Sequence, residues 1–185
     1  MDRLDPKTSI VVVVDVQEKL AAAMPPTQME ALMRAAKILV EASQALEIPV
    51  IATEQYPQGL GPTVPALREQ LASRTATVLP KTEFSAAEAP GFSAALANHR
   101  AKSIIVVGME THVCVFQTVR ELVGRGLSVH VPIDGVASRR DDHRQVGLDL
   151  CRAAGATITT AETIAFDWLR KAEGDAFKRV SKAVR

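Results

Sequence analysis

Two short runs in this chain are apolar on every residue, and they restrict its fold more than any other feature. They read IVVVV at residues 10–14 and IIVV at residues 104–107. A strand with one face in water alternates apolar and polar residues, whereas a strand covered on both faces is apolar throughout. We therefore expect both runs to be strands of a parallel sheet with helices on either side.

The rest of the chain alternates β-branched runs with longer segments of helical periodicity. The candidate strands are Ile10–Val14, Pro49–Thr53, Ala76–Leu79, Ser103–Val107, Ser128–Pro132 and Thr157–Thr159. The candidate helices are Thr27–Leu46, Thr63–Ala72, Gly91–Asn98, Val113–Arg125, Asp141–Ala154 and Ile164–Ala183. This alternation predicts an α/β fold, a three-layer α/β/α sandwich with a mainly parallel, Rossmann-like sheet of about six strands. With no internal repeat and no linker, residues 1–185 are expected to form a single domain.

The bulk composition argues against several classes of function. The chain has 22 Lys and Arg against 21 Asp and Glu, so its net charge of +1 creates no field that favours a nucleic acid or a membrane surface. Two cysteines are too few for a disulfide framework and are typical of a reducing compartment. Because no segment reads as a signal peptide or a transmembrane span, we expect a cytoplasmic protein that acts on a small molecule.

Three ionisable side chains follow predicted strands. Asp15 ends the first strand, Lys81 ends the third, and Cys114 follows the fourth across a Gly turn, at the start of a helix. The carboxyl ends of parallel strands form one edge of the sheet, where ligands bind. A helix start also lowers the pKa of a thiol, through free backbone N–H groups and the helix dipole. An acid, a cation and a thiol that converge at one edge indicate an enzyme.

A loop after the second predicted strand falls on the same edge. Residues 54–63 read EQYPQGLGPT, in which Gly and Pro interrupt regular structure after Gln55 and Tyr56. Such loops often carry binding residues. The side chains expected to line a substrate pocket are Gln17, Gln55, Tyr56, Phe84 and Phe116. They favour a small substrate with an apolar face and one or two polar groups.

The motifs at these positions occur in a specific order. They read D-x-Q, K-T-x-F-S, G-M-E-T-H-V-C-V-x-x-T, D-x-x-x-S-R and A-G-A-x-I-T-T, beginning at Asp15, Lys81, Gly108, Asp134 and Ala154. Over nearly the whole chain this order resembles the isochorismatase-like cysteine hydrolases. The segments TEQYPQGLGPT and GMETHVC look most like the isochorismatase-domain-containing proteins.

The resemblance implies a catalytic triad of Asp15, Lys81 and Cys114. Cys114 would attack an amide-like or carbamoyl-like carbonyl and form a thioester, while Asp15 would take the thiol proton and later activate water. Lys81 would stabilise the thiolate and orient Asp15. The backbone N–H groups of Glu110 and Cys114 would form the oxyanion hole.

The resemblance also implies a non-proline cis peptide between Met109 and Glu110, and a homo-oligomer of two or more subunits. Metal-binding relatives of the nicotinamidase type carry an Asp-x-His cluster, with further histidines, after the second strand. Here that region reads Thr53-Glu54-Gln55-Tyr56, and no histidine precedes His99. We therefore expect neither a metal nor another cofactor, and we do not expect nicotinamide as the substrate.

The sequence leaves alternatives open. Asp15 and Lys81 could form only a structural ion pair, and Cys114 could be a small buried apolar residue. The chain could be a non-catalytic oligomer that keeps the fold, or a thiol redox sensor, although Cys151 lies at helical spacing in a predicted core and offers no resolving thiol. Vinyl-ether hydrolysis is a further alternative, which the presence of Cys114 disfavours. His112 is two residues from Cys114, a spacing that does not bring side chains face to face, so we expect it to shape the site.

Overall fold

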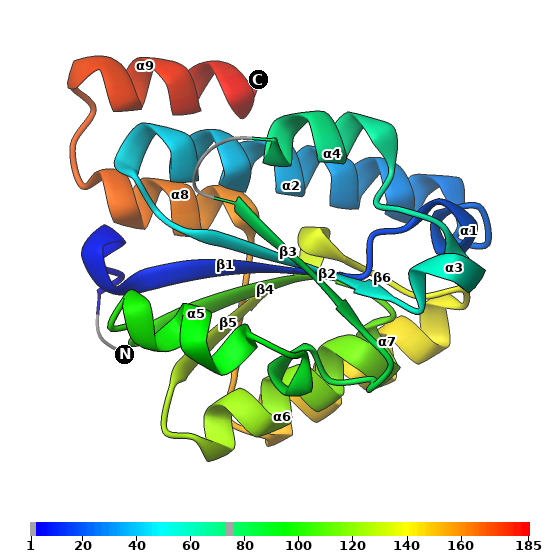
Figure 1. The fold of residues 1–185 in the computed structure, drawn as a ribbon. Helices are drawn as coiled ribbons and strands as arrows, with labels where there is room; N and C mark the ends of the chain where they lie inside the picture. Colours follow the sequence, from blue (N-terminus) through cyan, green and yellow to red (C-terminus); the bar gives the residue numbers. More distant parts are fainter. Residues whose placement is uncertain (1–2, 73–75) are drawn as a thin grey trace.

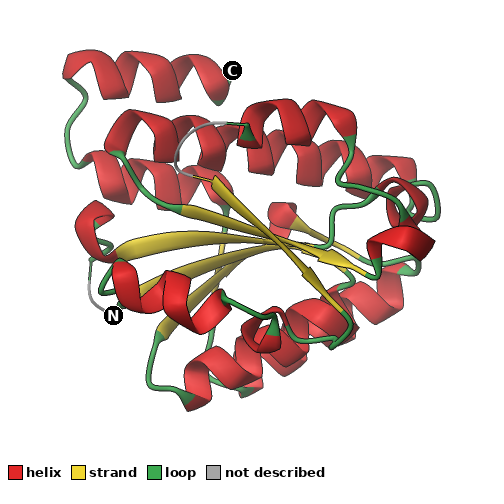
Figure 2. Cartoon of the chain, in the orientation of Figure 1, coloured by secondary structure: helices red, strands yellow, loops and turns green. Residues whose placement is uncertain are grey.

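The computed structural model describes residues 3–72 and 76–185. Within them the chain forms a seven-stranded sheet in which all paired strands are parallel (Figures 1 and 2). The strands are β1 Ser9–Val14, β2 Val50–Gln55, β3 Ala76–Lys81, β4 Ser103–Met109, β5 Ser128–Pro132, β6 Val136–Ala137 and β7 Thr157–Thr159. Their order is β3-β2-β1-β4-β5-β7, and β6 pairs with the end of β4. The predicted α/β class is confirmed.

Helices cover both faces of the sheet (Figure 1). One layer contains α2 Pro26–Leu46, α4 Pro65–Leu71, α8 Ala161–Leu169 and α9 Gly174–Ala183. The opposite layer contains α5 Phe92–Asn98, α6 Phe116–Gly124 and α7 Asp141–Ala153. The molecule is thus the predicted three-layer sandwich. In the described part of the chain, no helix is both long enough and apolar enough to cross a bilayer.

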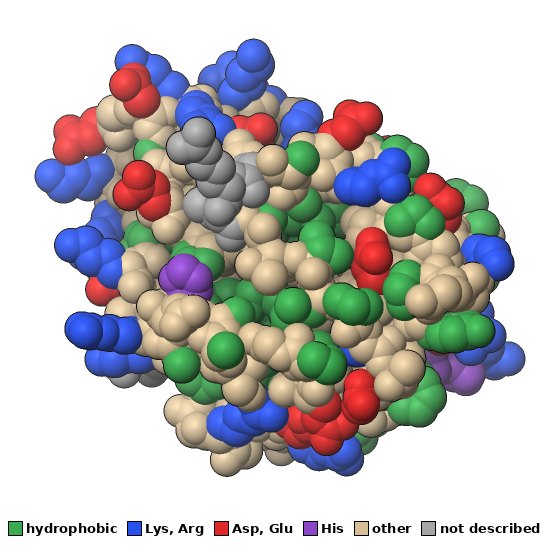
Figure 3. Space-filling model, in the orientation of Figure 1, with side chains coloured by type: hydrophobic (Ala, Val, Ile, Leu, Met, Phe, Trp, Pro, Cys, Tyr) green, Lys and Arg blue, Asp and Glu red, His purple; other side chains and the backbone are tan. Residues whose placement is uncertain are grey.

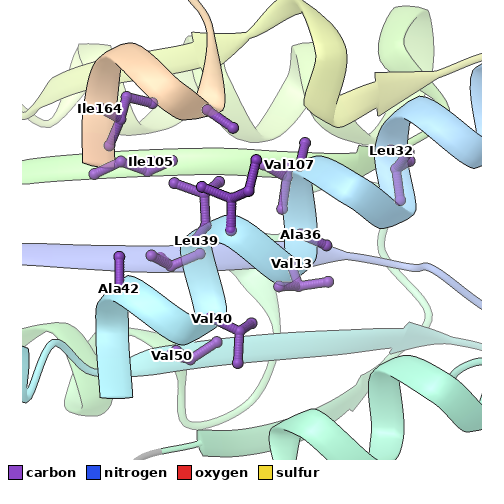
Figure 4. Close-up of a cluster of buried hydrophobic side chains, with 14 of the residues drawn as sticks. Val13, Leu32, Ala36, Leu39, Val40, Ala42, Val50, Ile105, Val107 and Ile164 are labelled. Carbon is purple, nitrogen blue, oxygen red and sulfur yellow. The ribbon is translucent and has the colours of Figure 1, made fainter. Parts of the chain in front are cut away.

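The side chains of β1 alternate between two hydrophobic cores. Val11 and Val13 belong to the core under α2, while Ile10 and Val12 belong to the core on the opposite face. Figure 4 shows Val13 in the first of these cores, together with Leu39 of α2. Successive residues of a strand point to opposite faces, so an all-apolar run fills two cores at once. This burial on both sides places β1 in the middle of the sheet, and its carboxyl end lies between those of its neighbours β2 and β4.

The largest differences from the predicted elements concern the last helix and one short strand. The prediction of a single final helix over Ile164–Ala183 is wrong, because this segment forms two separate helices, α8 and α9. Arg170 and Gly174 have positive φ angles of 64° and 82°; Arg170 ends the first helix, and Gly174 begins the second. The chain then turns so that α9 packs against α2. The two-residue strand β6 was not predicted, because two residues give no periodicity.

Short helical elements lie at the ends of the strands, most of them at the carboxyl edge of the sheet. They are α1 Glu18–Ala21, α3 Pro57–Leu60 and a π-helical turn Thr111–Val115 that leads into α6, with 3₁₀ segments at Pro6–Thr8, Ala86–Glu88 and Ile133–Gly135. The predicted helix Val113–Arg125 therefore begins within a wider turn. The predicted binding loop contains α3, so it is partly ordered as helix.

Candidate active site

The strand ends bring the three predicted catalytic residues to one edge. Asp15 directly follows β1, Lys81 is the last residue of β3, and Cys114 lies in the π-helical turn after β4. The turn depends on Gly108, because a Cβ there would lie 2.0 Å from the carbonyl oxygen of Val14. Only glycine lets the end of β4 approach β1 this closely.

Asp15 and Lys81 form a fully buried ion pair. Nζ of Lys81 lies 2.6 Å from Oδ2 of Asp15, and neither side chain is exposed to solvent. The same ammonium donates to Oε1 of Gln55 at 2.6 Å and contacts the carbonyl oxygens of Glu83 and Phe84 at 3.1 Å each. Four oxygen atoms around one nitrogen fix the position of the Lys81 side chain.

Asp15 also contacts two groups besides Lys81. Its Oδ1 accepts a hydrogen bond of 2.8 Å from Oγ1 of Thr53, and its carboxylate lies near enough to the thiol of Cys114 for each group to shift the pKa of the other. Burial raises the pKa of Asp15 above its usual value, against the opposing effects of Lys81, Thr53 and Cys114. A carboxylate with a raised pKa is a better proton acceptor than an ordinary one.

The thiol of Cys114 is protonated in this geometry. Burial first, and then the Asp15 carboxylate, raise its pKa to about 12, against the opposing effects of Lys81 and the backbone of Glu110. The expectation that a helix start lowers the pKa of this thiol is wrong. Cys114 is the fourth residue of the π-helical turn and only 7% exposed, so desolvation dominates.

The turn before Cys114 has its own hydrogen-bond network. The peptide between Met109 and Glu110 is cis, as expected. Oε1 of Glu110 accepts from the backbone N–H and Nε of Arg139, at 3.2 and 3.0 Å. Nδ1 of His112 lies 3.1 Å from Oγ of Ser138, which accepts from the backbone N–H of Thr111. Through Ser138, His112 therefore stabilises the π-helical turn that contains Cys114.

Two of the predicted substrate-binding residues, Gln17 and Gln55, use their side-chain amides for hydrogen bonds within the protein. Gln17 is fully buried, and its amide bonds to backbone groups of Gln55 and Gly61. The side chain of Gln55 accepts from Lys81 and donates to the carbonyl of Thr82. These contacts fix the loop after β2 to the end of β3.

The three aromatic candidates lie in different surroundings. Tyr56 and Phe84 are 56% and 55% exposed, whereas Phe116 is partly buried, with the guanidinium of Arg120 5.2 Å from its ring centre. A pocket of about 270 Å³ is bordered by Tyr56 and by Lys81. Neither Phe84 nor Phe116 borders it, and neither Asp15 nor Cys114 does.

Two threonines were not predicted to act in the site. Thr53 bonds to Asp15, as described above. Thr118 donates to the carbonyl of Cys114 at 2.7 Å and accepts from the backbone N–H of Ala86 at 2.8 Å, which ties the cysteine turn to the segment after Lys81. The four-residue spacing between Cys114 and Thr118 could have indicated this contact, because a threonine in a helix can donate to the carbonyl four residues before it.

Cys151 and the possible metal ligands can also be placed. Cys151 is fully buried in the core beneath α7, as predicted, and burial raises the pKa of its thiol to about 12. Among residues 3–72 and 76–185, no three His, Cys, Asp or Glu side chains cluster as a metal site would require.

Known proteins resemble this chain along most of its length. The isochorismatase domain matches residues 9–163. Isochorismatase family protein 1A of Dictyostelium discoideum is 34% identical over 179 residues, covering 96% of this chain and 86% of that protein. Isochorismatase domain-containing protein 2 of Bos taurus is 35% identical, covering 100% and 87%. A structure named MAR1 ribonuclease from Caenorhabditis elegans superposes with a TM-score of 0.90 at 37% identity, covering 99% and 92%.

The parallel α/β/α sandwich, with its ionisable residues at the carboxyl edge of the sheet, has the architecture of a Rossmann-like enzyme. This chain belongs to the isochorismatase family of hydrolases.

Proposed function

We propose that this protein is a cysteine-dependent hydrolase that cleaves a small amide-like or carbamoyl-like compound through a thioester intermediate. The observation that supports this most is the position of Asp15, whose buried carboxylate contacts both the ammonium of Lys81 and the thiol of Cys114. A structural ion pair alone would not need a thiol as a third partner.

The acylation step follows from the protonated state of the thiol. Because the pKa of Cys114 is about 12, almost no thiolate exists at neutral pH, so the proton must leave as the sulfur attacks. The S–C bond forms while the S–H proton moves to Asp15. The C–N bond then breaks, and Asp15 gives this proton to the leaving nitrogen.

Deacylation uses the same groups, but water is now the nucleophile and the sulfur of Cys114 is the leaving group. A water oxygen attacks the thioester carbon as its proton moves to Asp15, the S–C bond breaks, and Asp15 returns the proton to the sulfur. The oxyanion formed in each step would be bound by the backbone N–H groups of Glu110 and Cys114. The effect of the Glu110 backbone on the thiol supports this, because that backbone lowers the pKa of Cys114 and so lies near the reacting sulfur.

The same site favours a small molecule over RNA, although the Caenorhabditis elegans structure carries the name of a ribonuclease. RNA binding usually depends on clustered basic side chains that neutralise phosphates. This chain has a net charge of +1, and the reacting side chains of Asp15 and Cys114 are only 0% and 7% exposed, so a small compound reaches them more readily than a polymer does.

A thioester trap tests the proposal. The protein is incubated with a panel of small primary amides and carbamoyl compounds, quenched in acid and digested, and the peptide that contains Cys114 is weighed by mass spectrometry. We expect an acyl adduct on Cys114 and product release, both lost in Cys114→Ala and both kept in Cys151→Ala. Turnover that persists in Cys114→Ala would overturn the mechanism. Cleavage of an RNA substrate that depends on Cys114 would keep the nucleophile and overturn the substrate class.

The redox-sensor alternative has a separate outcome. Peroxide treatment would then give a disulfide or a sulfenic acid that changes the protein's state without substrate turnover. Cys151 is fully buried in a core, which disfavours it as a partner for Cys114.

We also propose a homo-oligomer that covers the outer face of β3. Tyr56, Val78 and Phe84 are 56%, 47% and 55% exposed, and Figure 3 shows apolar side chains gathered over β3. An exposed apolar edge strand is a usual site of association. Light scattering at micromolar concentration should give at least twice the 19.9 kDa mass of the chain. Val78→Asp should lower that mass, whereas Val146→Asp, on α7 and 54% exposed, should not. A monomeric wild type would refute the proposal.

A further inference from the structure

A second cavity, of about 710 Å³, lies between α8, the neighbouring strands β5 and β7, and the segment that precedes β1. It shares no bordering residue with the catalytic triad or with the smaller pocket beside Lys81. Its volume is within the range of pockets that hold small organic ligands. Nothing in the proposed reaction uses it.

The charges around this cavity do not cancel. Asp167 is already engaged, since its Oδ2 accepts from the backbone N–H of Leu4 at 2.8 Å and its Oδ1 lies 3.6 Å from Nε of Arg3. Arg170 is exposed, and its guanidinium has no hydrogen bond or ion pair to any residue within the described ranges. Burial lowers the pKa of His130, with Asp167 opposing, so His130 is neutral near pH 7. Two guanidinium groups against one carboxylate leave one positive charge.

The cavity also has an apolar wall. Leu4 and Ile164 are buried core residues that border it, and Phe166 is 37% exposed on the same helix. The hydroxyl-bearing residue Thr159 borders it from β7. A guanidinium fork binds carboxylate or phosphate in a bidentate manner, and apolar side chains bind the hydrocarbon body attached to such a group. The combination suits an amphipathic anion.

We propose that this cavity is a binding site for a small organic anion, a carboxylate or phosphate ester with an apolar body, in which Arg170 binds the acidic group. Arg170 ends α8 in a left-handed conformation beside the cavity. The site is independent of the proposed hydrolase activity.

Titration calorimetry with four probes tests the proposal. Benzoate and phenyl phosphate carry an anion on an apolar body, benzyl alcohol carries the body alone, and inorganic phosphate carries the anion alone. We expect saturable binding of benzoate or phenyl phosphate, and weaker binding of the other two probes. The organic anion with the lower Kd shows whether the site prefers a carboxylate or a phosphate. No saturable binding of either organic anion, or equal binding of benzyl alcohol, would overturn the proposal.

Variants then locate the site. Arg170→Gln should weaken binding by about tenfold or more, as expected for the loss of a charge-assisted hydrogen bond, and Arg170→Lys should recover part of the affinity. Arg152→Gln, an exposed arginine on α7, and Cys114→Ala should bind like the wild type. Circular dichroism checks that each variant is folded. Unchanged affinity in folded Arg170→Gln, or affinity lost in Cys114→Ala, would place the anion elsewhere and refute the assignment.

Discussion

Asp15 is the residue through which the proposed chemistry must pass, because it contacts both the cation and the thiol. Replacement by Asn keeps the shape and can still accept from Thr53, but an amide cannot take the thiol proton. We expect Asp15→Asn to lower kcat/KM by about two to four orders of magnitude, the usual value of a general base. Steady-state kinetics on a substrate from the thioester trap measure this.

The matched control is Asp149→Asn, which removes an exposed carboxylate on α7 and should leave turnover unchanged. Near-normal turnover in Asp15→Asn would show that the proton leaves by another route. His112 would be the next candidate to examine.

The pH dependence of activity follows from the same residue. Burial raises the pKa of Asp15 above its ordinary 3.8, so the carboxylate is protonated, and unable to accept a proton, at a higher pH than usual. We therefore expect kcat/KM to fall as pH falls through this raised pKa. The pKa of Cys114 is about 12, so its ionisation should cause no further change between neutral pH and pH 10. An alkaline rise in kcat/KM near pH 8–9, the range of an ordinary thiol, would contradict this assignment.

At the scale of elements, the position of Cys114 depends on how closely β4 passes β1. Gly108 has φ of 128°, and an added Cβ would meet the Val14 backbone at 2.0 and 2.7 Å, which no side-chain movement can relieve. We expect Gly108→Ala to lower the free energy of unfolding by about 2–4 kcal/mol and to abolish turnover. Urea denaturation measures the stability.

The control for Gly108 is Gly124→Ala at the end of α6. Nothing lies within 4 Å of an added Cβ at that position, and its backbone is helical. Alanine there should leave stability unchanged or raise it by about 0.5–1 kcal/mol. Equal free energies of unfolding for both variants would show that the approach of β4 to β1 leaves room for a side chain at position 108.

The elements also show what could be predicted from sequence. The all-apolar runs predicted the central strands, and the rule that parallel strands end at one edge predicted that Asp15 and Lys81 converge. The break between α8 and α9 could not be predicted, because it depends on backbone conformations at Arg170 and Gly174 that leave the helical periodicity intact. The partners of Gln17 could not be predicted either, since Gln55 is distant in sequence and meets it only through the path of a loop.

At the scale of the whole molecule, we propose that residues 1–185 form one domain, since both cores share one sheet. Two carboxylates that a stray metal ion could use at the carboxyl edge are already engaged: Glu54 accepts from the backbone and hydroxyl of Thr63 at 2.7 and 2.8 Å, and Asp15 is paired with Lys81. We expect turnover to be unchanged after dialysis against a chelator. Elemental analysis with activity assays before and after chelation measures this, and activity lost on chelation and restored by one metal ion would contradict it.

The complete burial of the Asp15–Lys81 pair limits how this sequence can diverge. Loss of either partner leaves the other charge without its counterion and without water, a state that costs about 3–5 kcal/mol, whereas replacement of both by apolar residues of similar volume is often tolerated. A lineage that abandons the pair must therefore cross a destabilised single variant or change both codons together. A substitution at either position is therefore selected against for as long as the other position keeps its charged residue.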